Sequence, residues 1–131
     1  MLKSIIPKGR SILFPVINYE MNALENPSLN TESKLVKHVM QDQDDIINLE
    51  AIVDDQKIPI YRVRSEPSFF TINVPKDNPY QIPGGGTTRA TADGFWVFLK
   101  PLPPGEHEIY FSGSCSLGTR NVKAKYHITA A

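Results

Sequence analysis

Acidic side chains are concentrated in one segment of this sequence, and carboxylates at that density could bind a cation. Residues 19–55 contain nine Asp and Glu against two Lys, although the whole chain balances 14 acidic with 14 basic residues. Calcium prefers oxygen ligands, and the candidate ligands are Asn18, Glu20, Asp42 and Asp45. Ile46 and Ile47 stand where an EF-hand loop that began at Asp42 needs a ligand and a glycine, so that motif is excluded. A solvated acidic surface is the alternative interpretation, with no cofactor.

Exposed aromatic rings are the second candidate for binding, because a flat ring can stack on a sugar. The candidates are Tyr19, Tyr61, Tyr80 and Tyr110, unless the sheet partly buries them. Arg89 follows Gly84-Gly85-Gly86, whose backbone amides could hold an anion. The glycines lack the following Lys of a P-loop, so we interpret them as a turn. These five side chains form the candidate ligand site, and the ligand would be a glycan or a protein.

Nothing in the sequence has the spacing of a catalytic centre. His38, His107 and His127 fall on three different expected surfaces, so a shared metal site is not predicted. We expect His107 at the edge of the core, hydrogen-bonded to the backbone. Cys115 is the single cysteine, so no internal disulfide can form, and no His or Asn lies nearby in sequence to activate it. The sequence therefore predicts a noncatalytic binding or interaction module, with a hydrolase using carboxylates of residues 19–55 as the alternative.

One helix and a series of short strands must position these residues. Thr31 is the predicted N-cap of a helix over about 31–44, whose apolar face carries Leu35, Val36, Val39 and Met40. Period-two alternation and frequent Pro, Gly and Asn predict strands near 2–6, 11–17, 47–53, 58–63, 69–74, 95–99, 106–111 and 121–129, and a short one at 87–91. This pattern predicts one domain over residues 1–131, an antiparallel β-sandwich of jelly-roll or immunoglobulin-like type with one covering helix.

The segment 95–99 is apolar on both faces, which is typical of a covered central strand. We expect it to form a hairpin with 106–111, which would place Trp96 and Phe98 in the sandwich core. The opposite face, Phe95, Val97 and Leu99, would then need a cover. The helix is the expected cover, and a second copy of the chain is the alternative, which would make the protein a self-associating structural one.

The same region carries a family resemblance. Asp93-Gly94-Phe95-Trp96-Val97-Phe98-Leu99-Lys100-Pro101-Leu102-Pro103-Pro104-Gly105-Glu106-His107-Glu108-Ile109-Tyr110-Phe111 is similar to the C-terminal signature of a family of small, mostly secreted, uncharacterised bacterial and archaeal proteins. Weaker likeness extends through 14–18 and 49–54. The resemblance implies a β-sandwich and an extracytoplasmic location, but no catalytic residues.

Composition removes several classes of function. Balanced charge without a basic field argues against nucleic acid as a partner. No apolar run approaches the length of a membrane span, and residues 1–10 lack the apolar stretch of a signal peptide.

Overall fold

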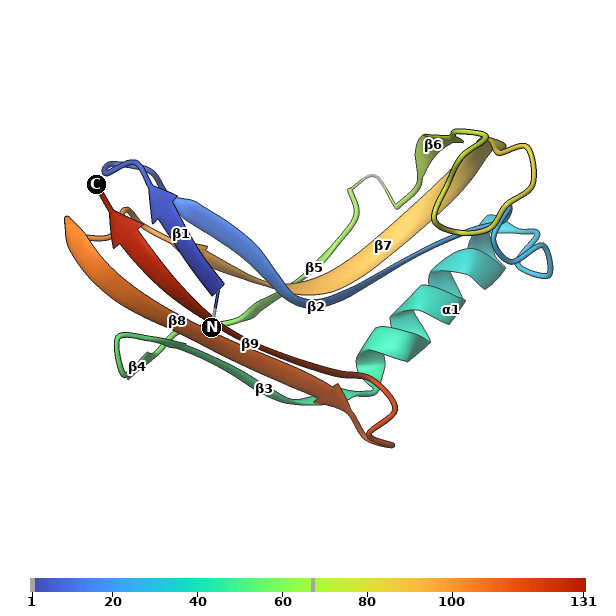
Figure 1. Ribbon diagram of the computed structural model, residues 1–131. Coiled ribbons are helices and arrows are strands. Elements are labelled where there is room, and N and C mark those ends of the chain that lie inside the picture. Colours follow the sequence, from blue (N-terminus) through green and yellow to red (C-terminus); the bar gives the residue numbers. More distant parts are fainter. Residues whose placement is uncertain (1, 67) are drawn as a thin grey trace. The chain divides into compact units, whose positions relative to one another are not determined.

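The computed structural model describes residues 2–66 and 68–131, and this part of the chain is mainly β with one helix (Figure 1). The elements in chain order are β1 (Leu2–Ile6), β2 (Ile12–Asn22), α1 (Glu32–Asp44), β3 (Ile46–Val53), β4 (Gln56–Lys57), β5 (Tyr61–Arg64), β6 (Phe70–Val74), β7 (Gly86–Leu99), β8 (Gly105–Cys115) and β9 (Asn121–Ala130). The predicted β-sandwich with one helix is therefore confirmed.

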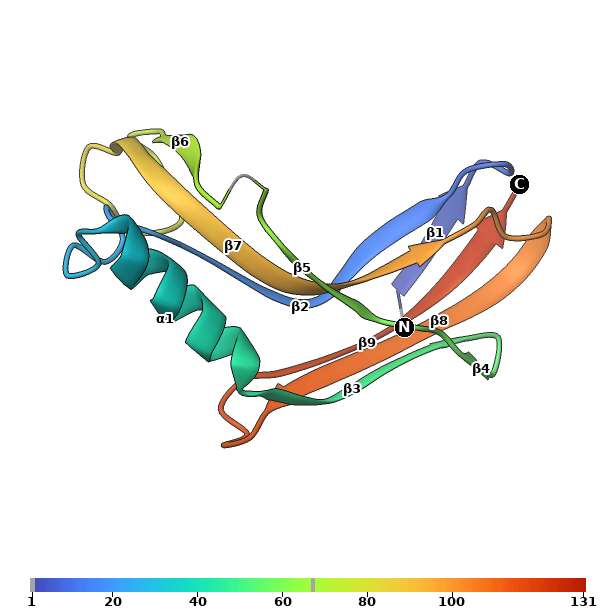
Figure 2. The same cartoon turned by 180° about the vertical axis from the view of Figure 1, so that it is seen from behind.

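The strands form two sheets. Sheet A has the order β1-β9-β8-β3-β4, and sheet B has the order β2-β7-β5 with β6 also paired to β7. In sheet A, β1 runs parallel to β9, and the other pairs are antiparallel. Figure 2 shows the β3–β4 hairpin beside β8. The orders β9-β8-β3 and β2-β7-β5 correspond to strands G-F-C and B-E-D of an immunoglobulin sandwich, so the strand order favours that alternative over a jelly roll.

The described chain forms two compact units. Unit 1 comprises residues 2–17, 45–62 and 95–131, and unit 2 comprises 18–44 and the described part of 63–94. Sheet A lies in unit 1, whereas α1 and β6 lie in unit 2. Because β2 and β7 run through both units, this division does not by itself define two domains, and the single domain stays a prediction.

The core of unit 1 is built from side chains that alternate along the strands. On β8, Ile109 and Phe111 are buried at 3% and 7% exposure, and they pack in one cluster with Val97. Successive side chains of a strand point to opposite faces, so this spacing turns one face of each sheet inward. Close packing continues along β8 at Gly113, where an added Cβ would lie 3.1 Å from Ile17 Cγ2. A side chain at that position would therefore force its neighbours apart.

The structure contradicts the expected pairing of 95–99 with 106–111. These segments belong to β7 in sheet B and β8 in sheet A, and β8 already has β3 and β9 on its two edges. The alternation on β7 is also the reverse of the expected one, since Val97 is 0% exposed and Phe98 is 58% exposed. Trp96 shares the face of Phe98 by the same alternation, so the prediction that both fill the core is wrong.

The inward face of β7 is closed within unit 1 by other strands. Phe95, Val97 and Leu99 pack in the cluster that contains Ile109 and Phe111 of sheet A. The facing sheet is therefore their cover, and the prediction that α1 covers them is wrong. Since these side chains lie inside unit 1, they are not available for the contact between two copies of the chain that the sequence suggested.

Helix α1 begins and packs as its sequence predicts. The Thr31 hydroxyl accepts a hydrogen bond from the Lys34 backbone N–H at 3.2 Å, which caps the first turn. Leu35 and Val39 are buried against Met21 of β2, in a separate core cluster of unit 2. As the one helix of residues 2–66 and 68–131, α1 lacks the length and apolar character needed to cross a membrane.

The loop between β6 and β7 is ordered by the side chain of Asn78. Its amide nitrogen donates to the carbonyls of Pro75 and Ile82 at 3.0 and 2.9 Å. Its oxygen accepts from the backbone N–H groups of Tyr80 and Ile82 at 3.1 and 3.0 Å. The strand expected at 87–91 is confirmed as part of β7.

Substitution of two neighbouring glycines in this loop should have different effects. Both have positive φ, +74° at Gly84 and +65° at Gly85. A Cβ at Gly85 would collide with the Val74 carbonyl oxygen and lie 2.5 Å from that of Pro75, whereas a Cβ at Gly84 meets nothing within 4 Å. We expect Gly85→Ala to cost about 1–2 kcal/mol more unfolding free energy than Gly84→Ala, measured by urea denaturation. Equal losses would contradict this close backbone approach.

Candidate ligand cavity

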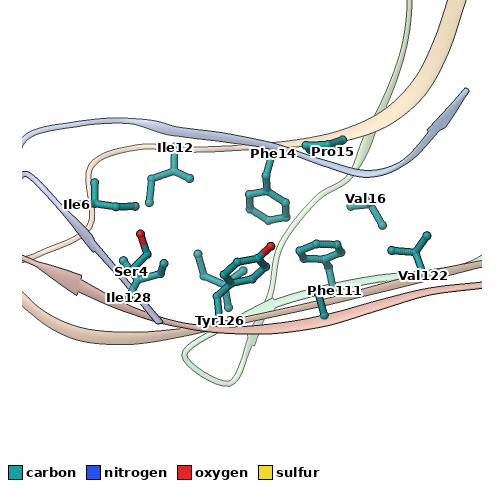
Figure 3. Close-up of a pocket in the computed structure, with 12 residues that line it drawn as sticks. Ser4, Ile6, Ile12, Phe14, Pro15, Val16, Phe111, Val122, Tyr126 and Ile128 are labelled. Atoms are coloured by element: carbon teal, nitrogen blue, oxygen red, sulfur yellow. The ribbon is translucent and has the colours of Figure 1, made fainter. Parts of the chain in front are cut away.

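An apolar hollow of unit 1 lies between the two sheets, beside the edge strands β1 and β2 (Figure 3). Its volume is about 570 Å³. Four strands contribute its lining, which consists of Ser4, Ile6, Ile12, Phe14, Pro15, Val16, Ile109, Phe111, Val122, Ala124, Tyr126 and Ile128. Small-molecule sites commonly have volumes of about 300–1,000 Å³, so the cavity has the size of such a site.

Three aromatic rings form the centre of the cavity wall. The ring centroids of Phe14 and Phe111 are 5.1 Å apart in a tilted arrangement. Those of Phe111 and Tyr126 are 6.1 Å apart and stacked. Figure 3 shows Phe14 projecting from one sheet toward Phe111 and Tyr126 on the other. Rings that pack in this way keep a defined shape, which favours a preformed site.

The polar groups in the cavity lining are two hydroxyls. Ser4 of β1 and Tyr126 of β9 line the cavity, and none of the twelve lining side chains carries a formal charge at neutral pH. In residues 2–66 and 68–131, neither hydroxyl has a hydrogen-bond partner. Both groups can donate and accept a hydrogen bond. Each is therefore free to form a hydrogen bond with a ligand in the cavity.

The cavity was not predicted from the sequence. The residues of β9 that line the cavity are Val122, Ala124, Tyr126 and Ile128. They follow the predicted alternation and lie on one face of the strand. The alternation predicts that this face is dry. It does not show that a space remains between the sheets, because that depends on side chains from β1, β2 and β8 that pack from distant parts of the sequence.

The candidate sugar-binding tyrosines of unit 1 lie on different sheets. Tyr61 is 60% exposed on β5 of sheet B. Tyr110 is on β8 of sheet A, on the face opposite to the buried Ile109, and the Lys123 ammonium lies 5.9 Å from its ring centroid. The structure therefore does not bring Tyr61 and Tyr110 onto one platform.

The other candidate ligand-binding residues lie in unit 2. The Tyr19 hydroxyl is hydrogen-bonded to His38 Nε2 at 3.1 Å. Tyr80 is 45% exposed in the loop after β6. Arg89 forms an ion pair with Glu32 at the start of α1. Two of these three side chains thus have partners within the chain, and a role for them in glycan binding stays a prediction.

The predicted calcium ligands have partners from the protein itself. Glu20 accepts a hydrogen bond from Asn22 at 3.1 Å. Burial raises the pKa of Glu20, the Asn22 hydrogen bond opposes this, and the nearby Glu25 carboxylate raises it further. Asp45 accepts a hydrogen bond from the Ser116 hydroxyl in unit 1.

Asn18 and Asp42, the other two predicted ligands, also interact with other groups. Within the described ranges, no three His, Cys, Asp or Glu side chains gather as a metal site. Calcium binding at these residues stays a prediction.

A second polar cluster in unit 1, which we call the His107 clasp, consists of His107, Asp54 and the Pro103 carbonyl. His107 Nδ1 lies 2.5 Å from Asp54 Oδ2, and Nε2 lies 2.6 Å from the Pro103 oxygen. Asp54 Oδ1 also accepts from the Glu108 backbone N–H at 2.9 Å. The backbone hydrogen bond expected for His107 is confirmed, whereas the contact with Asp54 was not predicted.

Both ring nitrogens of His107 face oxygen acceptors, which favours the doubly protonated imidazolium. The hydrogen bond to Asp54 and then that to Pro103 raise the pKa of His107, and desolvation opposes them. Desolvation alone would raise the pKa of Asp54, but the hydrogen bonds from His107 and Glu108 and the charge of His107 outweigh it and lower that pKa. The clasp therefore holds the β3–β4 turn to β8 as an ion pair.

Comparisons with known proteins add no assignment to these sites. The family resemblance, the extracytoplasmic location that it implies and the noncatalytic role all stay predictions. No protein-family model matches the chain, and no curated protein or solved structure is significantly similar to it.

Proposed function

We propose that this chain is a binding protein that holds a small apolar molecule in the cavity of unit 1. The cavity itself is the observation that carries this proposal. It is a half-open hollow of about 570 Å³ between the two sheets, and it is lined by aliphatic and aromatic side chains with two hydroxyls. This combination of volume and apolar lining is typical of sites for small organic ligands.

The lining favours an apolar ligand over a glycan. A sugar carries several hydroxyl groups, and each one that loses water without gaining a hydrogen bond costs free energy. Two hydroxyls, of Ser4 and Tyr126, are too few to satisfy a saccharide unit. An apolar ligand gains free energy from the same surface, because it leaves water together with the rings of Phe14 and Phe111.

A fluorescent hydrocarbon tests this function directly. Diphenylhexatriene emits strongly only in an apolar environment, and we expect its emission to rise to saturation at one probe per chain. Ala124→Phe should fill the cavity and weaken probe binding at least tenfold, since Ala124 lines it. Lys123→Phe is the matched control, because it places the same ring on the outward face of β9, and it should bind the probe as the natural chain does.

The folded state of each variant is checked by circular dichroism. If Ala124→Phe does not fold, Val122→Phe introduces the same ring elsewhere in the lining. Absence of saturable binding to the natural chain would overturn the proposal. So would unchanged binding to a folded cavity-filled variant. If light scattering showed that the chain dimerises while the probe is excluded, the cavity would be occupied by a second copy.

A further inference from the structure

We infer that the open edge of strand β1 pairs with the same edge of a second copy of the chain, so that sheet A continues across a twofold axis from one copy into the other. This inference goes beyond the proposed function, because the interface is a strand edge rather than the cavity lining. β1 lies at one end of the strand order of sheet A. One of its edges therefore faces no other strand of residues 2–66 and 68–131.

The backbone of β1 presents hydrogen-bonding groups to this open edge. The Ile6 carbonyl accepts a hydrogen bond at 3.0 Å from the N–H of Ala131, which directly follows β9. Backbone groups of successive residues point to alternate edges of a strand, so those of Lys3 and Ile5 point away from β9. Unpaired N–H and C=O groups at an edge are a template for another extended strand.

Other edge strands carry features that oppose the addition of a strand. At the far edge of sheet A, β4 is two residues long. The neighbouring β3 has an irregular register between Ile47 and Glu50, where Asn48 has a φ of +55°. On β2, at an edge of sheet B, Pro15 has no N–H to donate. β1, in contrast, has five residues in continuous register without a proline, and Lys3 is its one charged residue.

Two apolar side chains of β1 are left in water by the single chain. Leu2 is 57% exposed and Ile5 is 75% exposed. Leu2 alternates in phase with Ser4 and Ile6, which line the cavity, so it lies on the inward face of sheet A. Ile5 lies on the outer face with Lys3. A strand added beside β1 would cover part of both apolar side chains.

One antiparallel register fits β1 to its own copy. The inward residues of both strands must stay on one face, so the possible registers differ by steps of two residues. Centring on Lys3 would place two like charges opposite each other. Centring on Ile5 would place Lys3 opposite Pro7, which has no N–H. Centring on Ser4 places Lys3 opposite the partner's Ile5, and about four backbone hydrogen bonds can form.

The inward face also matches in this register. Leu2 lies opposite the partner's Ile6, so an apolar row continues from one copy into the other beside the cavity. The contact is isologous, as in most dimers. Two strands of five residues bury less than the standard interface of about 1,600 Å². We therefore expect a weak dimer whose population depends on protein concentration.

Sedimentation equilibrium over a range of protein concentrations tests the interface. The natural chain should change from monomer to dimer as its concentration rises. Ile5→Pro removes an N–H from the open edge and leaves the hydrogen bonds to β9, so it should weaken dimerisation roughly tenfold or more. Ile5→Thr is the matched control, because it keeps this N–H and a β-branched side chain. It should weaken dimerisation less than about threefold.

A disulfide tests the register. Ser4 would face Ser4 of the partner subunit at a non-hydrogen-bonded position, where Cα atoms lie about 4.5 Å apart and a disulfide can form. Ser4→Cys should therefore give a covalent dimer under mild oxidation. Lys123→Cys is the control, since Lys123 is exposed on β9 outside the segment that pairs with β1, and it should not. Both variants keep the buried Cys115, so the comparison isolates the new thiol.

Circular dichroism checks that each variant folds, and the disulfide decides the matter if Ile5→Pro does not fold. A natural chain that stays monomeric at millimolar concentration would overturn the inference, as would equal dimerisation of Ile5→Pro and Ile5→Thr. A dimer without the Ser4→Cys disulfide would also overturn it, and would indicate that β1 is exchanged between copies. Probe binding in the cavity is measured separately, so failure of this interface leaves the binding function standing.

Discussion

Phe111→Ala should lower the free energy of unfolding by about 3–5 kcal/mol, which is the usual cost of truncating a buried Phe. Phe111 is 7% exposed, and its ring packs between those of Phe14 and Tyr126. Loss of the ring removes contacts to both sheets and enlarges a space that already exists beside it. The midpoint of thermal unfolding, followed by circular dichroism, should fall by roughly 10 °C or more.

Phe98→Ala is the matched control for this prediction. The substitution is the same, but Phe98 is 58% exposed on the outer face of sheet B, opposite to the buried Val97 of the same strand. Its unfolding free energy should change by no more than about 0.5 kcal/mol, as for most surface substitutions. Similar losses in the two variants would contradict the assignment of Phe111 to the core and Phe98 to the surface.

His107→Ala should also lower the free energy of unfolding strongly, by about 2–3 kcal/mol near pH 6. The substitution removes two hydrogen bonds of a charged group. One of them is to the Asp54 carboxylate, and solvent partly screens that interaction. The His107 side chain is 10% exposed and that of Asp54 is 46% exposed. Urea denaturation of the natural chain and the variant gives this difference directly.

The effect of His107 should depend on pH in a defined direction. Its pKa is raised in the folded chain, so its stabilisation is complete below the unfolded value of about 6.5 and is lost as pH rises through the folded pKa. The pKa of Asp54 is lowered in the folded chain, so the stabilisation that its carboxylate contributes is lost as pH falls through this folded-state pKa. The difference between the natural chain and His107→Ala should therefore shrink from pH 6 toward alkaline pH.

Asp54→Asn provides the control for this pH dependence. Asparagine keeps an oxygen for the Glu108 N–H, but it removes the negative charge beside His107. The imidazole titration, measured by NMR, should move to a lower pKa in this variant. An unchanged titration would mean that Asp54 does not hold the proton on His107.

Local signals in the sequence were sufficient for the elements whose partners are close in the chain. The Thr31 cap and the apolar spacing of Leu35 and Val39 predicted α1 almost to its ends. The alternation from Val122 to Ile128 predicted β9 and its inward face. These features depend on backbone hydrogen bonds and side-chain periods that a short segment determines by itself.

Non-local pairing limited what the sequence could predict. The strands around residues 100–104 were assigned to one hairpin because they are neighbours in sequence, yet the chain passes there from sheet B to sheet A. This error reversed the expected faces of Val97 and Phe98. The His107 clasp required the β3–β8 register that pairs Val53 with Ile109, and no local signal gives that register.

The parallel pairing of β1 with β9 has a consequence for the order of folding. Leu2 pairs with Tyr126, so this edge of sheet A cannot form until nearly the whole described chain is present. At synthesis rates of about 5–20 residues per second, the intervening chain takes roughly 6–25 s to emerge. During that time Ile12 and Phe14 of β2 lack the β9 side chains that complete the lining of the cavity around them. The ligand cavity is therefore completed only after β9 has been synthesised.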